Sequence, residues 1–122
     1  GKGTILVVDD EDLVSRMAKA ALQRLGYAVI TAVNGQEAVD LYSSNPDGID
    51  MVLLDMTMPV MGGEEALRRM IEIRPDAAVV AMSGFDEREA KQRFGNRIAG
   101  FVQKPFTPGQ LSARIAAAQR RG

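Results

Sequence analysis

The stretch Ile5-Leu-Val-Val8, followed at once by Asp9-Asp10-Glu11, decides how this chain folds. Four consecutive apolar residues leave no polar face, so this run predicts a strand of a parallel sheet that is covered on both sides. Four further short apolar runs follow it, separated by segments with helical patterns. These runs occupy residues 28–32, 51–54, 78–82 and 99–102.

The first segment between two runs has the spacing of a helix. Leu13, Met17, Ala21 and Leu25 recur at four-residue intervals, which predicts that they form the buried face of that helix. Gly26 follows, at the position where a left-handed cap commonly ends a helix.

Helix-start signals precede the other segments. Three pairs can form capping boxes, namely Asn34 with Glu37, Asp86 with Glu89, and Thr107 with Gln110. Gly62-Gly63 precedes the remaining helical segment, which Pro75 ends. The predicted order is therefore strand then helix, five times. For a chain of 122 residues this indicates an open, doubly wound parallel α/β sheet with helices on both faces.

Length and composition fit one globular domain over residues 1–122, with 46% hydrophobic and 25% charged residues. The formal net charge is −1 and basic residues are scattered, so we expect no nucleic acid contact. The chain has no cysteine and no histidine, so its chemistry must use carboxylates, lysine or hydroxyl groups. No apolar run approaches the ~20 residues that span a bilayer, so we expect no membrane contact and a cytoplasmic location.

Polar residues stand where the predicted strands end. Asp9-Asp10-Glu11 follows the first run, Asp55 the third, Ser83 the fourth and Lys104-Pro105 the fifth. Ligands of open parallel sheets bind beyond the carboxyl ends of the strands, so these side chains are expected at one edge. Crowded carboxylates repel one another, and a hard divalent cation such as Mg²⁺ relieves that repulsion.

This set of residues indicates phosphoryl transfer. A carboxylate beside Mg²⁺ is a competent nucleophile toward phosphorus and gives an aspartyl phosphate, here on Asp55. Lys104 can contact the phosphoryl oxygens as a point charge, and the Ser83 hydroxyl can donate a hydrogen bond to another oxygen. Taken singly, Asp9-Asp10 reads as a solvated cap, Lys104 as a surface lysine and Ser83-Gly84 as a turn. Their shared edge favours the chemical interpretation.

These motifs together resemble the receiver domains of response regulators. They are Asp9-Asp10, Leu53-Leu-Asp55-Met-Thr-Met-Pro59 followed by Gly62, Ser83-Gly84 and Lys104-Pro105. The resemblance covers essentially the whole chain and implies a flavodoxin-like (βα)5 domain. It also implies that Asp55 is the phosphoacceptor, that Asp10 and Asp55 bind Mg²⁺ directly with the Thr57 backbone carbonyl, and that Asp9 holds the metal largely through water.

The same resemblance assigns roles on the last two strands. Lys104 and Ser83 would sense the phosphoryl group, and Phe101 stands where the family has an aromatic switch, three residues before the lysine. Phe101 lacks the hydroxyl of the commoner tyrosine, so a switch through that hydrogen bond is not expected. The Lys104-Pro105 peptide bond is expected to be cis, as in relatives.

Three stretches look most like receivers fused to hybrid sensor histidine kinases. They are residues 3–11, Met82-Ser-Gly-Phe85 and residues 99–106. The implied partners are a histidine kinase or histidine phosphotransfer domain, together with a homodimer on phosphorylation. A parent kinase could be membrane-anchored, and whether the chain counts as an enzyme depends on that parent, because the domain itself supplies only phosphorylation and dephosphorylation of its own aspartate.

Two other functions fit these residues less well. An aspartate-nucleophile phosphatase places a second aspartate two residues after the nucleophile, where this chain has Thr57. A dinucleotide-binding module needs a glycine-rich turn after the first strand, where Asp9-Asp10-Glu11 would repel a pyrophosphate. A stand-alone single-domain response regulator and a phosphorylation-independent receiver-like binding module remain alternatives.

Overall fold

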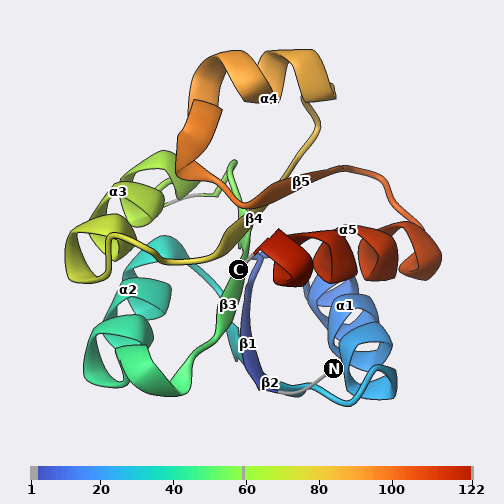
Figure 1. Cartoon of the computed structure of the whole chain (residues 1–122), viewed down its shortest axis with the longest axis horizontal. Helices are drawn as coiled ribbons and strands as arrows, with labels where there is room; N and C mark the ends of the chain where they lie inside the picture. Colours follow the sequence, from blue (N-terminus) through green and yellow to red (C-terminus); the bar gives the residue numbers. More distant parts are fainter. Residues whose placement is uncertain (1–2, 59, 122) are drawn as a thin grey trace.

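Strands and helices alternate along the chain in the computed structural model, which describes residues 3–58 and 60–121 (Figure 1). The strands are β1 (Thr4–Val8), β2 (Ala28–Ala32), β3 (Met51–Asp55), β4 (Val79–Ser83) and β5 (Gly100–Gln103). The helices are α1 (Asp12–Arg24), α2 (Gly35–Ser44), α3 (Gly63–Ile73), α4 (Glu87–Phe94) and α5 (Pro108–Arg121). Two short 3-10 turns, η1 (Pro46–Gly48) and η2 (Gly95–Arg97), follow α2 and α4. Pro59, which belongs to the quoted receiver motif, lies outside the described residues.

The five strands form one parallel sheet in the order β2-β1-β3-β4-β5. The first strand, β1, therefore lies next to one edge; the chain forms that edge with β2 and then crosses back to build β3, β4 and β5 on the other side of β1. In sheets of this order the ligand crevice lies beyond the carboxyl ends of β1 and β3, where the direction of winding reverses. The register pairs Val8 with Leu54 and Asp55 with Met82, so the ends of the central strands lie side by side.

Alternating strand residues supply two cores, one on each face of the sheet. Leu6, Val8 and Leu54 pack with α2, α3 and α4, whereas Ile5 and Val7 pack with α1 and α5. Figure 1 shows the same division, with α2 and α3 on one side of the sheet and α1 and α5 on the other. The strand positions and the two-sided helical cover predicted from the apolar runs are confirmed.

The second apolar run differs from the others because β2 is an edge strand. Only Ala32 is buried in it, and Ile30 is 37% exposed, whereas all five residues of β3 are buried. An edge strand has a neighbour on one side only, so the same apolar composition buries less surface there.

The buried face predicted for the first helix is shifted. Of the predicted face Ala21 is buried, but Leu13 is 80% exposed and Leu25 is 37% exposed; α1 buries Ala18 and Leu22 beside Ala21 against the sheet. Small alanine side chains allow the helix to approach the strands closely, and a neighbouring stripe of leucines is then turned toward solvent. Four-residue spacing identifies a helix, but it does not choose between two adjacent apolar stripes.

The predicted helix starts are confirmed, and among the described residues the pair at α5 forms the complete, reciprocal capping box. The Asn34 and Asp86 side chains each accept a hydrogen bond of 2.8 Å from the backbone amide three residues later. At α5, Thr107 Oγ1 accepts from the Gln110 amide at 3.1 Å, and Gln110 Oε1 accepts from the Thr107 amide at 2.9 Å. Gly26 has φ of 96°, as a left-handed helix end requires. None of the described helices is long and apolar enough to cross a membrane.

Candidate active site at the carboxyl edge of the sheet

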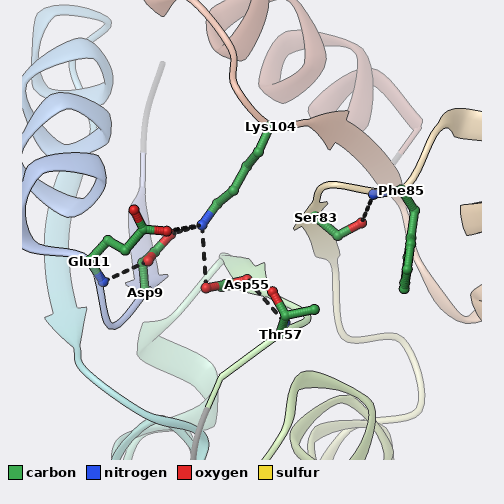
Figure 2. Close-up of polar contacts among 7 residues, drawn as sticks. All are labelled: Asp9, Glu11, Asp55, Thr57, Ser83, Phe85 and Lys104. Atoms are coloured by element: carbon green, nitrogen blue, oxygen red, sulfur yellow. Dashed lines mark hydrogen bonds and ion pairs between the residues drawn. The ribbon is translucent and has the colours of Figure 1, made fainter.

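Four neighbouring strands each deliver one polar side chain to the same edge of the sheet (Figure 2). Asp9 follows β1, Asp55 ends β3, Ser83 ends β4 and Lys104 follows β5. Asp9 and Asp55 are each 1% exposed and Ser83 is fully buried. Carboxylates are almost never buried without a partner, so this edge needs a source of positive charge.

The Lys104 ammonium supplies that charge. Its Nζ lies 2.8 Å from Asp9 Oδ2, 3.3 Å from Asp55 Oδ2 and 3.4 Å from Glu11 Oε1. Figure 2 shows the lysine side chain reaching across from β5 to these three carboxylates. Of these contacts, those to Asp55 and Glu11 are hydrogen bonds and the one to Asp9 is an ion pair, so one ammonium serves three carboxylates.

The two oxygens of Asp55 have different surroundings. Oδ1 accepts hydrogen bonds from the Thr57 amide at 3.1 Å and from the Thr57 hydroxyl at 3.2 Å, while Oδ2 faces Lys104. Burial raises the pKa of Asp55, the Asp9 charge adds to that rise, and the Thr57 amide and Lys104 oppose it. The loop after β3 therefore fixes the rotation of the carboxylate while leaving one oxygen toward the ammonium.

The pKa of Lys104 reflects the same competition with the opposite result. Burial alone would lower the pKa of the ammonium, but the short contact with Asp9 and the charges of Asp55 and Asp9 together raise it. Lys104 is therefore a fixed positive charge at neutral pH.

Three carboxylates could hold a divalent cation. Asp9, Asp10 and Asp55 can each place one oxygen within 4.8 Å of the others. Asp9 Oδ1 accepts the Glu11 amide at 2.8 Å, whereas its buried Oδ2 has no partner among the described residues besides the Lys104 ammonium. The donor set is all oxygen and Asp10 is exposed, so the site fits Mg²⁺, which keeps several waters and takes few protein ligands.

The structure does not bring the Ser83 hydroxyl to the carboxylates. Ser83 Oγ instead accepts a hydrogen bond of 3.1 Å from the Phe85 amide and points away from Asp55 (Figure 2). The Phe85 ring in turn contacts Phe94, at a centroid distance of 6.4 Å, and the Arg93 guanidinium, which lies 4.4 Å from the ring centroid. The hydroxyl is therefore tied to the start of the α4 region and not to the acidic site.

Phe101 lies in the core on β5, 7% exposed, and packs in the cluster beneath α2, α3 and α4. It lines a hollow of about 600 Å³ bounded by α4, β5 and α5, which Lys91 and Arg114 also border. The Lys104-Pro105 peptide bond is cis, as expected.

The start of α3 requires a glycine at position 63 because the helix lies against the backbone of β3, which the sequence did not reveal. A Cβ on Gly63 would lie 2.4 Å from Met56 Cα and 2.7 Å from the Asp55 carbonyl oxygen. The first turn of α3 therefore packs directly on the backbone that carries Asp55. Adjacent Gly62 has open space at the same position, so only the second glycine is required sterically.

Two contacts of the site were not anticipated. The sequence places Glu11 among the acidic residues after the first strand but indicates no role for it, and it indicates none for Phe85. The Glu11–Lys104 pair joins residues 93 positions apart, so no local signal in the sequence could have revealed it. The Phe85–Arg93 contact joins an aromatic residue before α4 to a basic residue on that helix, and such pairs are too common in sequences to predict a contact.

Comparison with known proteins agrees with this geometry. The response regulator receiver domain family matches residues 5–116. The sensor kinase CckA of Brucella abortus is 34% identical over 116 residues, which cover 94% of this chain but only 12% of that kinase. A response regulator receiver domain protein from Clostridium thermocellum matches with a TM-score of 0.87 at 32% identity, covering 98% of this chain and 95% of its own. A chain of the CheX-CheY-BeF3-Mg²⁺ complex from Borrelia burgdorferi gives a TM-score of 0.89 at 28% identity, over 96% and 89% of the two chains.

Proposed function

Because this chain belongs to the response regulator receiver domains of two-component signalling, we propose that Asp55 is its phosphoacceptor and takes a phosphoryl group from a phosphohistidine. The observation that carries the proposal is the state of Asp55: a carboxylate 1% exposed at the end of β3, with its Oδ2 3.3 Å from the Lys104 ammonium that also contacts Asp9. Burying a charged carboxylate has a large energetic cost, and carboxylates held in this way are typical of functional sites. The surroundings of Asp55 therefore suit a carboxylate whose charge changes when it is phosphorylated and dephosphorylated.

In the proposed transfer, an oxygen of Asp55 forms a bond to phosphorus while the bond from phosphorus to the donor imidazole nitrogen breaks. The imidazole leaves with the electron pair of that bond. The Thr57 amide and hydroxyl hold the carboxylate rotation during attack. Hydrolysis later reverses the state: water attacks phosphorus and the Asp55 carboxylate leaves.

Asp10 and Asp55 would hold Mg²⁺ together with the Thr57 carbonyl, and Asp9 would contribute largely through water. The bound ion would neutralise charge that develops on the transferred group. The fit rests on the clustered oxygens of Asp9, Asp10 and Asp55 and on the buried Asp9 Oδ2 described above.

Lys104 and Ser83 would then contact the phosphoryl oxygens. Lys104 is already within 3.3 Å of Asp55, but Ser83 must turn away from the Phe85 amide to reach a group on that aspartate. We propose that this change loosens the loop after β4 and the packing of Phe85 on Arg93 and Phe94, and that Phe101 responds to it on β5.

We propose that residues 1–122 form one receiver domain of a hybrid histidine kinase. Support comes from the match to the sensor kinase CckA, of which this chain spans 12%. The phosphoryl donor would be a histidine kinase or a histidine phosphotransfer domain, and phosphorylation could join two copies of the domain. A cytoplasmic location fits both donors, because the phosphoryl group originates from the ATP that a histidine kinase uses.

Incubation with acetyl phosphate and Mg²⁺, read by intact mass and hydroxylamine sensitivity, tests the assignment. The wild type is expected to gain one labile phosphoryl group, and Asp55→Asn to gain none. Asp12→Asn, which removes a 75% exposed carboxylate near the site, is the matched control and should be labelled like the wild type. Equal labelling of Asp55→Asn would refute the assignment, and no labelling by acetyl phosphate or a cognate kinase would favour a phosphorylation-independent binding module.

A further inference from the structure

We infer that Glu11 is a positioning residue that receives the Lys104 ammonium when a divalent cation takes over Asp9 and Asp55. The inference rests on the proposed function, because it concerns the same metal-dependent site. It adds a residue to which neither the motifs nor the proposed mechanism gives a role.

Lys104 occupies the oxygens that a cation would use. Its Nζ lies 2.8 Å from Asp9 Oδ2 and 3.3 Å from Asp55 Oδ2, and both aspartates belong to the trio that can converge within 4.8 Å. A cation bound there would repel the ammonium at short range in a largely buried setting. Binding of the ion and release of Lys104 from these oxygens are therefore coupled.

Glu11 is the remaining partner of that ammonium. Its Oε1 lies 3.4 Å from Nζ, and its side chain is 64% exposed, whereas those of Asp9 and Asp55 are 0% and 1% exposed. The exposed carboxylate can follow a displaced ammonium, but the buried ones cannot. The Lys104 side chain is 16% exposed, so without Glu11 the displaced charge would remain partly buried with fewer acceptors.

The local structure of Glu11 supports this reading. It is the N-cap of α1, a position that favours Asp, Asn, Ser or Thr because a short side chain bonds the free helix amides. Glu11 makes no such cap bond; its side chain extends to Lys104, and its amide instead donates to Asp9 Oδ1 at 2.8 Å. Glu11 thus contacts both Asp9, through its backbone amide, and Lys104, through its side chain, and Lys104 is the cation that competes with a metal ion for Asp9.

The first test measures Mg²⁺ affinity of the whole chain by calorimetry, without any phosphodonor. Glu11→Gln is expected to weaken Mg²⁺ binding about two- to fivefold, the range that an exposed ion pair contributes. Glu11→Asp keeps the charge, but its side chain is one methylene too short to hold the ammonium equally well. We therefore expect Glu11→Asp to weaken Mg²⁺ binding nearly as much as Glu11→Gln does. Because aspartate is a favoured N-cap, Glu11→Asp should melt no lower than the wild type, which separates lost affinity from misfolding. Asp12→Asn reports the effect of removing an exposed charge nearby and should change affinity less than twofold.

The second test repeats Glu11→Gln in a Lys104→Met background. Lys104→Met should tighten Mg²⁺ binding by roughly tenfold, because the competing cation is gone. In that background, the change in log Kd for Mg²⁺ caused by Glu11→Gln should be less than half of the change that it causes in the wild type. An equal effect in both backgrounds, or wild-type affinity in Glu11→Asp, would overturn the inference and leave Glu11 as a general surface charge. Failure of the proposed function looks different, because the wild type itself would then bind no Mg²⁺ or accept no phosphoryl group.

Discussion

Replacing Asp55 with asparagine is expected to stabilise the fold at neutral pH, although it removes the proposed phosphoacceptor. Burial raises the pKa of Asp55, with the Asp9 charge adding to the rise. The folded state therefore binds the Asp55 proton more tightly than the unfolded state does. The stability that Asp55 contributes is full below its ordinary pKa of 3.8 and is lost as pH rises through the raised folded value. At neutral pH the ionised carboxylate is a net cost.

The size of that cost follows from three opposing terms, because an asparagine oxygen can still accept the Thr57 hydrogen bonds and these cancel in the comparison. At an effective dielectric constant of about 20, the Lys104 ammonium 3.3 Å away attracts Asp55 by about 5 kcal/mol. The Asp9 carboxylate, which has an oxygen within 4.8 Å of one on Asp55, repels it by about 3.5 kcal/mol when the separation is taken at that upper bound. Burying the ion costs several kcal/mol, taken as about 3. The balance is a net cost of about 1.5 kcal/mol, in the direction that the raised pKa of Asp55 requires.

Urea unfolding in EDTA, for the wild type and Asp55→Asn, measures this difference. Asp55→Asn should be more stable by about 1–2 kcal/mol at pH 7.5, and the gap should shrink as pH falls toward the ordinary value of 3.8. Asp12→Asn, which removes an exposed carboxylate, should differ from the wild type by less than about 0.5 kcal/mol. The reasoning fails if Asp55→Asn is the less stable protein at pH 7.5, or if its advantage grows in acid.

Two backbone predictions concern the loop before α3. Gly63→Ala should destabilise the fold by about 2 kcal/mol or more, because its Cβ would lie 2.4 Å from Met56 Cα. Gly62→Ala, where a Cβ would meet open space, should cost about 0.5 kcal/mol. Equal urea midpoints for the two variants would contradict this prediction. Val60 has φ of 71° and is 85% exposed, and asparagine tolerates this left-handed backbone better than valine, so Val60→Asn should stabilise the fold by about 1 kcal/mol. Val33 is also exposed but has no positive φ, so Val33→Asn should change the stability little. A thermal melt of both valine variants checks the second prediction, and a lower midpoint for Val60→Asn would refute it.

Much of the fold was readable from local pattern. Apolar runs such as Ile5-Leu-Val-Val8 are strands because nothing polar in them can face water, and every capping pair forms its helix end because those contacts span only three residues. The site was readable for a related reason. Parallel strands bring their carboxyl ends to one edge, so Asp9, Asp55 and Lys104 were expected at that edge, and the strand order then brings them into contact.

What the pattern could not supply depended on competition between packing arrangements. Leu13 fits a helical stripe as well as Leu22 does, and only contact with the sheet decides that Leu22 is buried. Ser83 could have faced Asp55, but the Phe85 amide takes its hydroxyl in this state. Such choices turn on rotamers and on neighbours from other elements, which local spacing does not encode.

The sequence by itself determined five strands, five helices, the receiver family resemblance and the edge where the polar residues gather, because each rests on short-range periodicity or on a property common to all parallel sheets. Tertiary structure alone decided the strand order β2-β1-β3-β4-β5, the close approach at Gly63 and the pairing of Glu11 with Lys104. Those features join residues far apart in the chain, and they are fixed by which surfaces pack best and by where a buried ammonium finds its acceptors.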